Sequence, residues 1–491
     1  MITPYTLRLL AYAVVIVGLI KIIIARLQSP LAKLPGPKYT SFTSLVLKYK
    51  ELTHGRRVYV HDLHQKYGPV VRLSPNEVSY ATVDAAKEIY LSGGSGYDKT
   101  PFYTLFTQFG TRTLFSTLPR ADHSYMKRYL ADRYANTNIM KPEVLNGISN
   151  HAKDFLNKCM EKCSSPDGFA DVYVHLHCFA LDGVTHHLFH PYGTHANVND
   201  KDLRLMQELS YHDSLASNYI IYYVPALTKL VAYLSPPKLS PLSNEYVLKT
   251  SAAKDPSAHS LLSKLQSHAK ATPSMPPYGV PAECKDHLAA GVDTTGDTLC
   301  FLMYQLSLPT PASTRVQSLL HQELVQNPTV PFDQLPYLDA VVKEGLRCFP
   351  PIPMSLPRFV PDGGSTIEGY WVPGGTIVSC QAWTLHKDPN VFPQPLEFIP
   401  ERWLDEDKEA VTERNRWSFA FSVGGRGCLG RHLAIAEMKT LLREVYSQCR
   451  TTLSPHMTGD MQMEDQIIAT RPKDQTCKLV FEKIGQTWAL Q

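Results

Sequence analysis

The sequence has few cysteines, little net charge and no linker-like stretch. Ten cysteines in 491 residues are too sparse and too irregularly spaced for a disulfide framework, which favours a reducing compartment. A net charge of +4 from scattered lysines and arginines gives no basis for nucleic-acid binding. Because no Gly/Ser-rich stretch or charge block divides the chain after residue 40, we expect residues 41–491 to form one large domain.

The sequence also lacks a flavin- or nicotinamide-binding motif, since no G-x-G-x-x-G follows a predicted strand.

The one long apolar run is residues 9–24, interrupted only by Lys21. With its flanks it reaches about 20 residues, or roughly 30 Å as a helix, which is enough to span a bilayer. No small-residue cleavage site follows it, so a retained signal anchor over 1–28 is favoured over a removed signal peptide or a buried core helix.

The charges around this run predict its orientation. Arg26, Lys33 and Lys38 follow the run and only Arg8 precedes it, so the body of the protein is expected in the cytosol. Residues 29–40 are rich in proline, and we interpret them as a stiff hinge between the anchor and the domain.

A single cysteine, Cys428, follows a glycine-rich stretch and opens a helical pattern over 429–446. Backbone N–H groups at a helix start favour a thiolate, so this sulfur is a ligand or a nucleophile. Arg426 offers a fixed cation two residues earlier. The nearby glycines allow positive φ and close approach of a flat, bulky group; they are Gly424, Gly425, Gly427 and Gly430.

Cys428 has three other interpretations. A buried free cysteine is the commonest case for an isolated cysteine. A cysteine protease requires a histidine and asparagine partner set, and a zinc site requires a second Cys or His pair, whereas only His432 lies close in sequence.

The stretch 421–430 fits F-x-x-G-x-R-x-C-x-G at every specified position and resembles the haem-binding loop of the cytochrome P450 family. The resemblance implies haem b as cofactor, Cys428 as the axial iron ligand and Arg426 as a partner of a haem propionate. Phe421 and Gly430 complete the cofactor loop in this comparison.

Residues 280–306 read as one long helix that contains Ala290-Gly-Val-Asp-Thr-Thr295. Gly291 costs about 1 kcal/mol relative to Ala in a helix, so we expect another element to approach it closely. The Thr294 hydroxyl can bond to the Ala290 carbonyl and open a groove. The segment resembles the family's A/G-G-x-D/E-T-T/S signature, which implies that Asp293 and Thr294 deliver protons during oxygen activation.

Further residues are assigned by the same resemblance. Glu344, Arg347 and Arg402 correspond to a buried Glu-Arg-Arg triad that serves folding and haem retention. Arg358, on an extended proline-rich strand, is expected at a propionate. The position four after His123 is Lys127 where arginine is usual, so Lys127 and Arg128 both remain candidates for a propionate.

Candidate pocket residues come from four segments. An aromatic-rich stretch at 101–115 is expected over the haem, although core packing is equally favoured for any one of its residues. Residues 218–225 are either a mobile lid that touches the membrane or a buried helix end, and residues 467–470 return a further loop to the pocket. The named candidates are Phe102, Phe106, Phe109, Phe115, Ala290, Ile352, Met354 and Leu356.

These observations predict a mainly α fold with a small β region and one N-terminal transmembrane helix. The resemblance implies a monooxygenase of the endoplasmic reticulum membrane, single-pass and with a cytosolic catalytic domain, that acts with O2 on a lipophilic small molecule, in the style of fungal secondary metabolism. Its expected electron donor is the NADPH-dependent cytochrome P450 reductase, and it contacts membrane lipid but no nucleic acid. The alternatives are a haem-thiolate isomerase or dehydratase that needs no O2, and a non-catalytic haem-binding protein.

Overall fold

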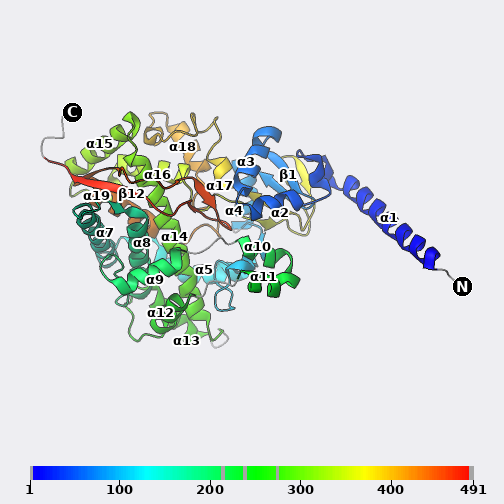
Figure 1. Ribbon diagram of the computed structural model, residues 1–491, viewed down its shortest axis with the longest axis horizontal. Coiled ribbons are helices and arrows are strands. Elements are labelled where there is room, and N and C mark those ends of the chain that lie inside the picture. Colours follow the sequence, from blue (N-terminus) through cyan, green and yellow to red (C-terminus); the bar gives the residue numbers. More distant parts are fainter. Residues whose placement is uncertain (1–3, 95, 212–215, 236–239, 273–275, 486–491) are drawn as a thin grey trace.

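The computed structural model describes residues 4–485 except 95, 212–215, 236–239 and 273–275. It has a mainly helical body and a β-rich region at one end, as the sequence predicts, and one long helix projects from the β-rich end (Figure 1). The α-helices are α1 (Pro4–Gln28), α2 (Leu45–Leu52), α3 (Arg56–Tyr67), α4 (Val83–Leu91), α5 (Arg120–Tyr134), α6 (Asn136–Ile139), α7 (Pro142–Cys163), α8 (Val172–Phe189), α9 (Asp200–Ser210), α10 (Ala216–Tyr223), α11 (Thr228–Leu234), α12 (Pro241–Ser251), α13 (Leu261–Ala271), α14 (Gly279–Ser307), α15 (Pro311–Gln326), α16 (Pro336–Cys348), α17 (Ala382–Leu385), α18 (Lys408–Trp417) and α19 (Arg431–Tyr446).

Short 3-10 turns and strands complete the fold. The 3-10 turns are η1 (Pro30–Lys33), η2 (Lys38–Ser41), η3 (Ser92–Gly94), η4 (Pro101–Phe106), η5 (Pro225–Leu227), η6 (Phe332–Gln334) and η7 (Pro400–Trp403). The strands are β1 (Val70–Ser74), β2 (Glu77–Tyr80), β3 (Asp98–Lys99), β4 (Ala170–Asp171), β5 (Arg358–Phe359), β6 (Ser365–Ile367), β7 (Tyr370–Val372), β8 (Ile377–Cys380), β9 (Cys449–Leu453), β10 (Met463–Asp465), β11 (Thr470–Pro472) and β12 (Lys478–Lys483).

The largest sheet has the order β1-β2-β8-β5-β3. β1 and β2 form the hairpin that their alternating sequence predicts, with Val70 opposite Tyr80. β8 runs parallel to β2 and antiparallel to β5, which pairs in turn with β3. A second sheet, β4-β12-β9, covers the opposite end of the molecule. The first sheet therefore holds β3 and β5, and with them Lys99 and Arg358, at one edge.

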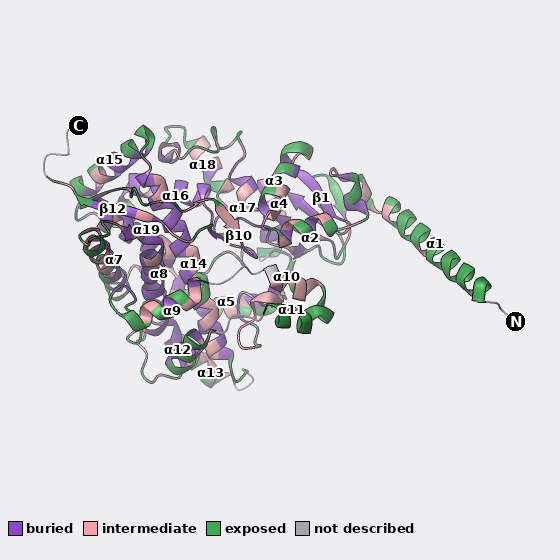
Figure 2. Cartoon of the chain, viewed as in Figure 1, coloured by how far each residue is buried: buried purple, intermediate pink, exposed green. Residues whose placement is uncertain are grey.

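Helices α8 and α14 lie in the centre of the helical body, and most of their residues are buried (Figure 2). The predicted close approach at Gly291 is present: a Cβ there would lie 2.6 Å from a methyl carbon of Val184 on α8. A side chain at this position would push the two helices apart. The glycine therefore lets α14 pass directly against α8 through the core.

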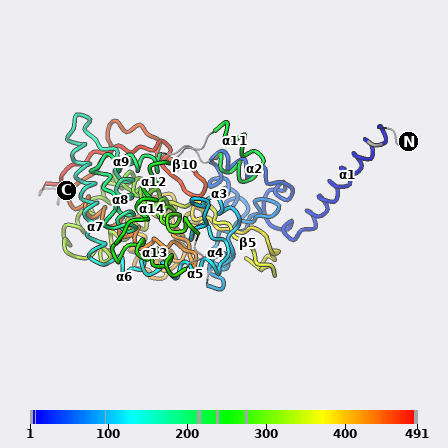
Figure 3. Tube along the Cα trace, turned by 90° about the horizontal axis from the view of Figure 1, so that it is seen from below, coloured from blue at the N-terminus to red at the C-terminus, as the bar shows by residue number. Residues whose placement is uncertain are grey.

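Helix α1 is the one described helix that is long and apolar enough to cross a membrane. It extends away from the body in two perpendicular views, and the share of its apolar window that is buried is 0% (Figures 1 and 3). The non-helical residues 34–37 that follow it are attached to the first sheet, because the backbone N–H of Arg72 donates to the Pro35 carbonyl at 2.8 Å. The hinge is thus part of the folded domain at its β-rich end.

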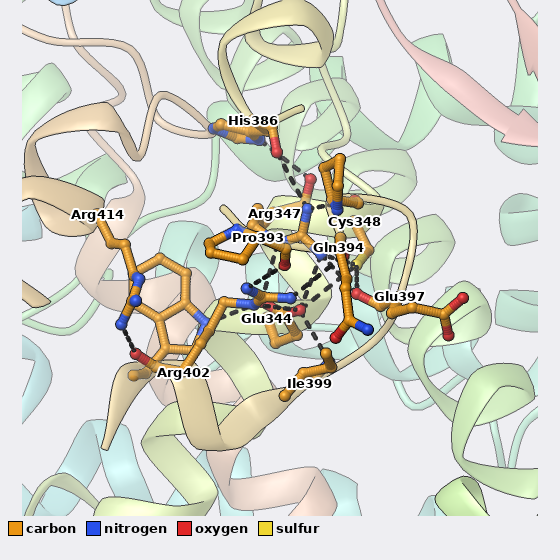
Figure 4. A network of polar contacts seen from close by, with 12 residues as sticks. Glu344, Arg347, Cys348, His386, Pro393, Gln394, Glu397, Ile399, Arg402 and Arg414 are labelled. Atoms are coloured by element: carbon orange, nitrogen blue, oxygen red, sulfur yellow. Dashed lines mark hydrogen bonds and ion pairs between the residues drawn. The ribbon is translucent and has the colours of Figure 1, made fainter. Parts of the chain in front are cut away.

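The carboxylate of Glu344 on α16 lies at the centre of a buried ion network (Figure 4). The Arg347 guanidinium donates to it at 2.8 and 2.9 Å, and Arg402 donates to it at 3.1 Å. The indole N–H of Trp403 and the backbone N–H of Ile399 also donate to this carboxylate, each at 2.9 Å. The two arginines are therefore held by one fully buried anion, in the arrangement that the sequence predicts.

The remaining donors of Arg347 extend the network to the segment before η7. They reach the backbone carbonyl oxygens of His386, Pro395 and Glu397 at 2.7 to 3.0 Å. Charged groups that are buried with all their hydrogen bonds made hold their surroundings in one geometry. The network thus ties α16 to the long loop that leads to η7.

Replacing Glu344 by Gln should lower the free energy of unfolding by about 3–5 kcal/mol, because two buried guanidinium groups lose their anion. The matched control is Glu161→Gln, since Glu161 and Lys158 form an ion pair with the same (i, i+3) spacing on the surface. That change should leave stability almost unaltered. Urea unfolding followed by circular dichroism measures both, and equal midpoints for the two variants would contradict a structural role for the triad.

Candidate functional site

The cysteine loop, residues 421–430, connects α18 to α19 and is shaped by two residues at positive φ. These are Ser422, with φ 54°, and Gly424, with φ 76°. A Cβ on Gly424 would collide with the Tyr90 carbonyl oxygen, so this position requires glycine. Gly425, Gly427 and Gly430 do not have positive φ, which corrects the sequence expectation; the loop needs only one left-handed glycine because Ser422 supplies the other turn.

Cys428 is exposed, unlike most cysteines of the chain, and its backbone N–H donates to the Phe421 carbonyl at 2.9 Å. The surrounding protein raises the pKa of the thiol through burial, while the N–H groups of Gly430 and Arg431 and the charge of Lys127 act to lower it. The sulfur therefore faces an open space inside the protein and is met by the N–H groups at the start of α19, as the sequence predicts.

Three cations are buried close to this loop and repel one another. Lys99, Arg358 and Arg426 are 4%, 2% and 9% exposed. Burial lowers the pKa of Lys99 well below its ordinary value, and the charges of Arg358 and Arg426 lower it further. Burial and the charge of Arg358 likewise lower the pKa of Arg426 to about 10. Such a cluster calls for an anionic partner.

The partners of these three cations do not neutralise the group. Arg426 reaches Asp98 at 3.1 Å, but its Nε and Nη1 atoms are buried without a hydrogen-bond partner among the described residues. Lys99 donates to the Phe115 carbonyl at 2.5 Å, and Arg358 donates to the Tyr103 hydroxyl at 2.6 Å. We refer to Lys99, Arg358 and Arg426 as the cation cluster.

The structure distinguishes Lys127 from Arg128. Lys127 is half-buried and donates to the Gly427 carbonyl at 2.6 Å, within the cysteine loop, whereas Arg128 is exposed. Among the residues predicted for a propionate, Arg426, Arg358 and Lys127 therefore come together and Arg128 does not. Lys99 was missed by the sequence reasoning, because nothing in its local pattern separates it from a lysine on the surface.

On α14, Thr294 has the predicted local geometry: its hydroxyl donates to the Ala290 carbonyl at 2.6 Å. Ala290 is exposed although Leu288 and Val292 are 0% and 1% exposed, so a hollow borders this turn of the helix. Thr295, the next residue, lies 3.5 Å from the Glu437 carboxyl on α19. The Ala290–Thr294 turn is thus held beside the helix that follows the cysteine loop.

Asp293 lines a small cavity of about 90 Å³ between α14, α8 and β11. The same cavity is lined by Asp297, which sequence reasoning missed, one turn further along α14. Burial raises the pKa of Asp297 to about 6, and His177 lies 3.4 Å from its carboxyl oxygen. The carboxyl of Asp293 and the hydroxyl of Thr294 therefore face different neighbours.

Most of the predicted pocket residues form one apolar cluster. Rings of Phe106 and Phe115 meet edge to face at 5.2 Å. The cluster also includes Tyr219 of α10, in the stretch expected to be either a lid or a buried helix end, and the loop 467–470 that the sequence placed near the pocket. Its members include Phe102, Phe106, Phe115, Ile352, Met354, Tyr219, Ile467 and Ile468.

Three predicted pocket residues lie outside this cluster: Ala290 on α14, described above, Phe109 and Leu356. Phe109 occupies a tight two-residue turn closed by Gln108 and Thr111, and its φ of 47° turns the ring toward Tyr278, with the ring centroids 6.0 Å apart. Leu356 packs against the core of the first sheet. At Phe109 the cause is local, because the turn directs its ring away from the cluster.

A second cavity of about 230 Å³ adjoins the apolar cluster and ends at buried charges. Its lining includes Phe102, Met354 and Tyr223 of α10. The Tyr223 hydroxyl donates to Glu51 at 2.7 Å, and Arg56 bridges Glu51 and Glu77. Helix α10 is therefore fastened to α2 and α3 by a polar contact at the far end of this cavity.

Comparison with known proteins identifies the class. The cytochrome P450 family model matches residues 34–479. Cytochrome P450 monooxygenase cypX of Dothistroma septosporum is 29% identical over 98% of this chain and 96% of its own length. Cytochrome P450 monooxygenases orf2 of Aspergillus niger and stcB of Emericella nidulans are 26% and 28% identical over 95% and 92% of this chain, and over 96% and 89% of their own lengths.

The chain therefore belongs to the cytochrome P450 family, whose cofactor is haem, and it is an enzyme of the monooxygenase class.

Replacing Lys99 by Met should stabilise the haem-free protein and accelerate haem loss. Removal of one of three buried like charges relieves repulsion in the empty site, whereas a lost charge-assisted hydrogen bond costs about 1.5–3 kcal/mol of haem affinity, or roughly 10- to 100-fold. Thermal unfolding of the haem-free form and haem transfer to an acceptor apoprotein measure the two effects. Lys87→Met is the control, because Lys87 is a surface residue paired with Asp84. If Lys99→Met raises the unfolding temperature of the haem-free protein but does not accelerate haem loss, Lys99 is not a partner of a haem propionate.

Proposed function

We propose that this protein inserts one oxygen atom from O2 into a lipophilic small molecule, with electrons from a separate NADPH-dependent reductase. The observation that carries the proposal is the convergence of Cys428, the cation cluster and the Ala290–Thr294 turn. Haem, when bound, supplies the oxygen-activating chemistry. Protein residues hold the haem, position the substrate and move protons.

The residues present fit a haem. The Cys428 sulfur is exposed inside the protein and meets N–H groups that favour a thiolate, which suits an iron ligand. The orphaned Nε and Nη1 atoms of Arg426, together with Lys99 and Arg358, suit the two propionate groups. Lys127 holds the cysteine loop through the Gly427 carbonyl and adds a further positive charge.

Thr294 is proposed to hold a proton relay at its Oγ1 atom. Because its own hydroxyl proton is donated to the Ala290 carbonyl, Oγ1 presents lone pairs to the hollow beside Ala290 and can accept a hydrogen bond there. Asp293 would exchange protons through the small cavity that it shares with Asp297. Thr294 and Asp293 thus link the hollow beside Ala290 to the titratable carboxyl groups of Asp293 and Asp297.

The substrate side is apolar and aromatic, which supports a lipophilic substrate. The cluster around Phe102, Phe106 and Phe115 offers ring faces and edges, and Met354 adds a flexible thioether. The cavity behind Phe102 is the proposed entry path, and the contact between Tyr223 and Glu51 closes it. Opening of α10 would break this one hydrogen bond at the entrance.

The membrane is the proposed source of the substrate. Helix α1 supports anchoring to the endoplasmic reticulum membrane, with the domain in the cytosol. Helices α10 and α11 lie next to α2, on the same side of the body as α1 in both views (Figures 1 and 3). The exposed apolar residues of this segment support a membrane-facing lid; they are Val224, Leu227, Leu230, Tyr233 and Leu234.

The fungal relatives support a substrate from secondary metabolism. Comparison of metabolites in the native host with and without the gene identifies the compound. The requirement for a reductase and O2 then separates a monooxygenase from an isomerase or dehydratase, because the latter turns over without either.

Cys428→Ser should abolish the red-shifted Soret band of the ferrous carbon monoxide complex that sulfur ligation produces. The reason is that a serine hydroxyl does not replace a thiolate as iron ligand. The matched control is Cys348→Ser, which changes a buried cysteine outside the loop. A red-shifted band that persists in Cys428→Ser would overturn the ligand assignment.

Thr294→Ala should lower product formed per NADPH by about tenfold or more, since a positioned proton-transfer group typically contributes about 10²–10⁴-fold. Oxygen would still be consumed and would appear as hydrogen peroxide. Thr298→Ala is the control, because Thr298 makes the same back-bond, at 2.8 Å to the Thr294 carbonyl, one turn further along. Equal coupling in the two variants would count against the relay.

A further inference from the structure

A group of histidines lies on the far side of the helical body from the first sheet and plays no part in the proposed chemistry. His151 is on α7, His186 is on α8, and His195 is in the loop between α8 and α9. The imidazole rings of His151 and His195 are 5.2 Å apart, and those of His151 and His186 are 5.9 Å apart. Asp154 is three residues after His151 and therefore shares its helix face.

The candidate ligand atoms of His151, Asp154 and His195 all lie within 4.8 Å of one another. Zinc binds imidazole nitrogen and carboxylate oxygen at roughly 2.0–2.2 Å, so tetrahedral ligand atoms are about 3.3 Å apart. Ligand atoms must therefore approach one another by up to about 1.5 Å. The exposed His195 and the half-buried Asp154 are the side chains that can make this movement. Two imidazoles and one carboxylate, with a water molecule in the fourth position, form a common zinc ligand set.

The surroundings of His151 suit a zinc ligand. His151 is 3% exposed, and its Nδ1 atom is buried without a hydrogen-bond partner among the described residues. An imidazole nitrogen without a hydrogen-bond partner is the atom with which histidine binds a metal.

The neighbours fix the geometry around His151. Gly147, one turn earlier on α7, makes room for the His186 ring, because a Cβ there would collide with it. The backbone N–H of His195 donates to the Asp202 carboxylate at 3.0 Å, in the first turn of α9. Lys158, one turn after Asp154, pairs with Glu161 instead, so in the described part of the chain no ion pair neutralises Asp154.

We propose that His151, Asp154 and His195 form a binding site for one zinc ion that connects α7 to the loop before α9. Its three ligands are not among the residues proposed to hold the haem or to move protons. It joins α7 to this loop, whose rings at His151 and His195 already meet, and it restrains the start of α9. Because α9 ends at Ser210, which lines the small cavity beside Asp293, the metal holds one wall of that cavity through the helix.

The test uses the haem-loaded full chain without a histidine tag, stripped with a chelator and titrated with zinc chloride by calorimetry. We expect one saturable site per chain. His195→Ala and Asp154→Asn should each weaken zinc binding at least tenfold. Neither substitution should disturb the core, because Asp154 is half-buried and His195 is exposed. His456→Ala is the matched control, because His456 is exposed on a distant loop and should leave the affinity unchanged.

Two structural readouts accompany the titration. The zinc X-ray absorption edge should show two imidazoles in a nitrogen and oxygen shell, and hydrogen exchange of residues 195–204 should slow when zinc is added. The proposal is overturned by the absence of a saturable site, by unchanged affinity in both His195→Ala and Asp154→Asn, or by a zinc shell that contains sulfur.

Discussion

Buried like charges set the main constraint on this structure. The cation cluster brings three positive side chains together within the protein, and the carboxylate that pairs with it among the described residues, Asp98, lies at its exposed edge. Because the three side chains are buried, their repulsion is screened less than it would be at the surface. The fold holds the three cations at the edge of the first sheet, where β3 and β5 pair, and the haem propionates that these cations suit would compensate their charge. Cofactor binding and folding are therefore coupled at this point.

The ion network of Glu344 shows how the chain deals with buried charge when no cofactor is involved. Its two arginines have a shared carboxylate, a tryptophan N–H on the same anion and several backbone carbonyls. Nearly every donor has an acceptor, in contrast to Arg426, which has two buried atoms without one. The same residue type is thus structural in one place and available for a ligand in another, and the difference lies in how many donors the chain itself satisfies.

The contacts of the site that the sequence predicted correctly are formed between residues close together on one helix. The bond from Thr294 to Ala290 spans one helical turn, and the Glu344 and Arg347 pair has a fixed helical spacing, so both follow from the sequence. Lys99 could not be found in this way, because only the pairing of β3 with β5 brings it to Arg358. Phe109 was misplaced for a related reason: an aromatic-rich stretch predicts burial, but the turn at Phe109 and Gly110 decides which direction the ring points.

The proposed substrate pocket is the least local part of the molecule. The apolar cluster combines η4, the lid helix α10, the stretch at 352–354 and the loop at 467–470, which are far apart in sequence. The lid is held at one end by Tyr219, whose hydroxyl donates to the Ile467 carbonyl at 2.7 Å, and at the other by Tyr223 and Glu51. Each hydrogen bond of this kind contributes only about 1 kcal/mol, so the lid is held weakly compared with the core helices α8 and α14. A rigid cofactor side and a weakly held substrate side therefore coexist in one domain, which allows the pocket to change while Cys428 and Thr294 stay in place.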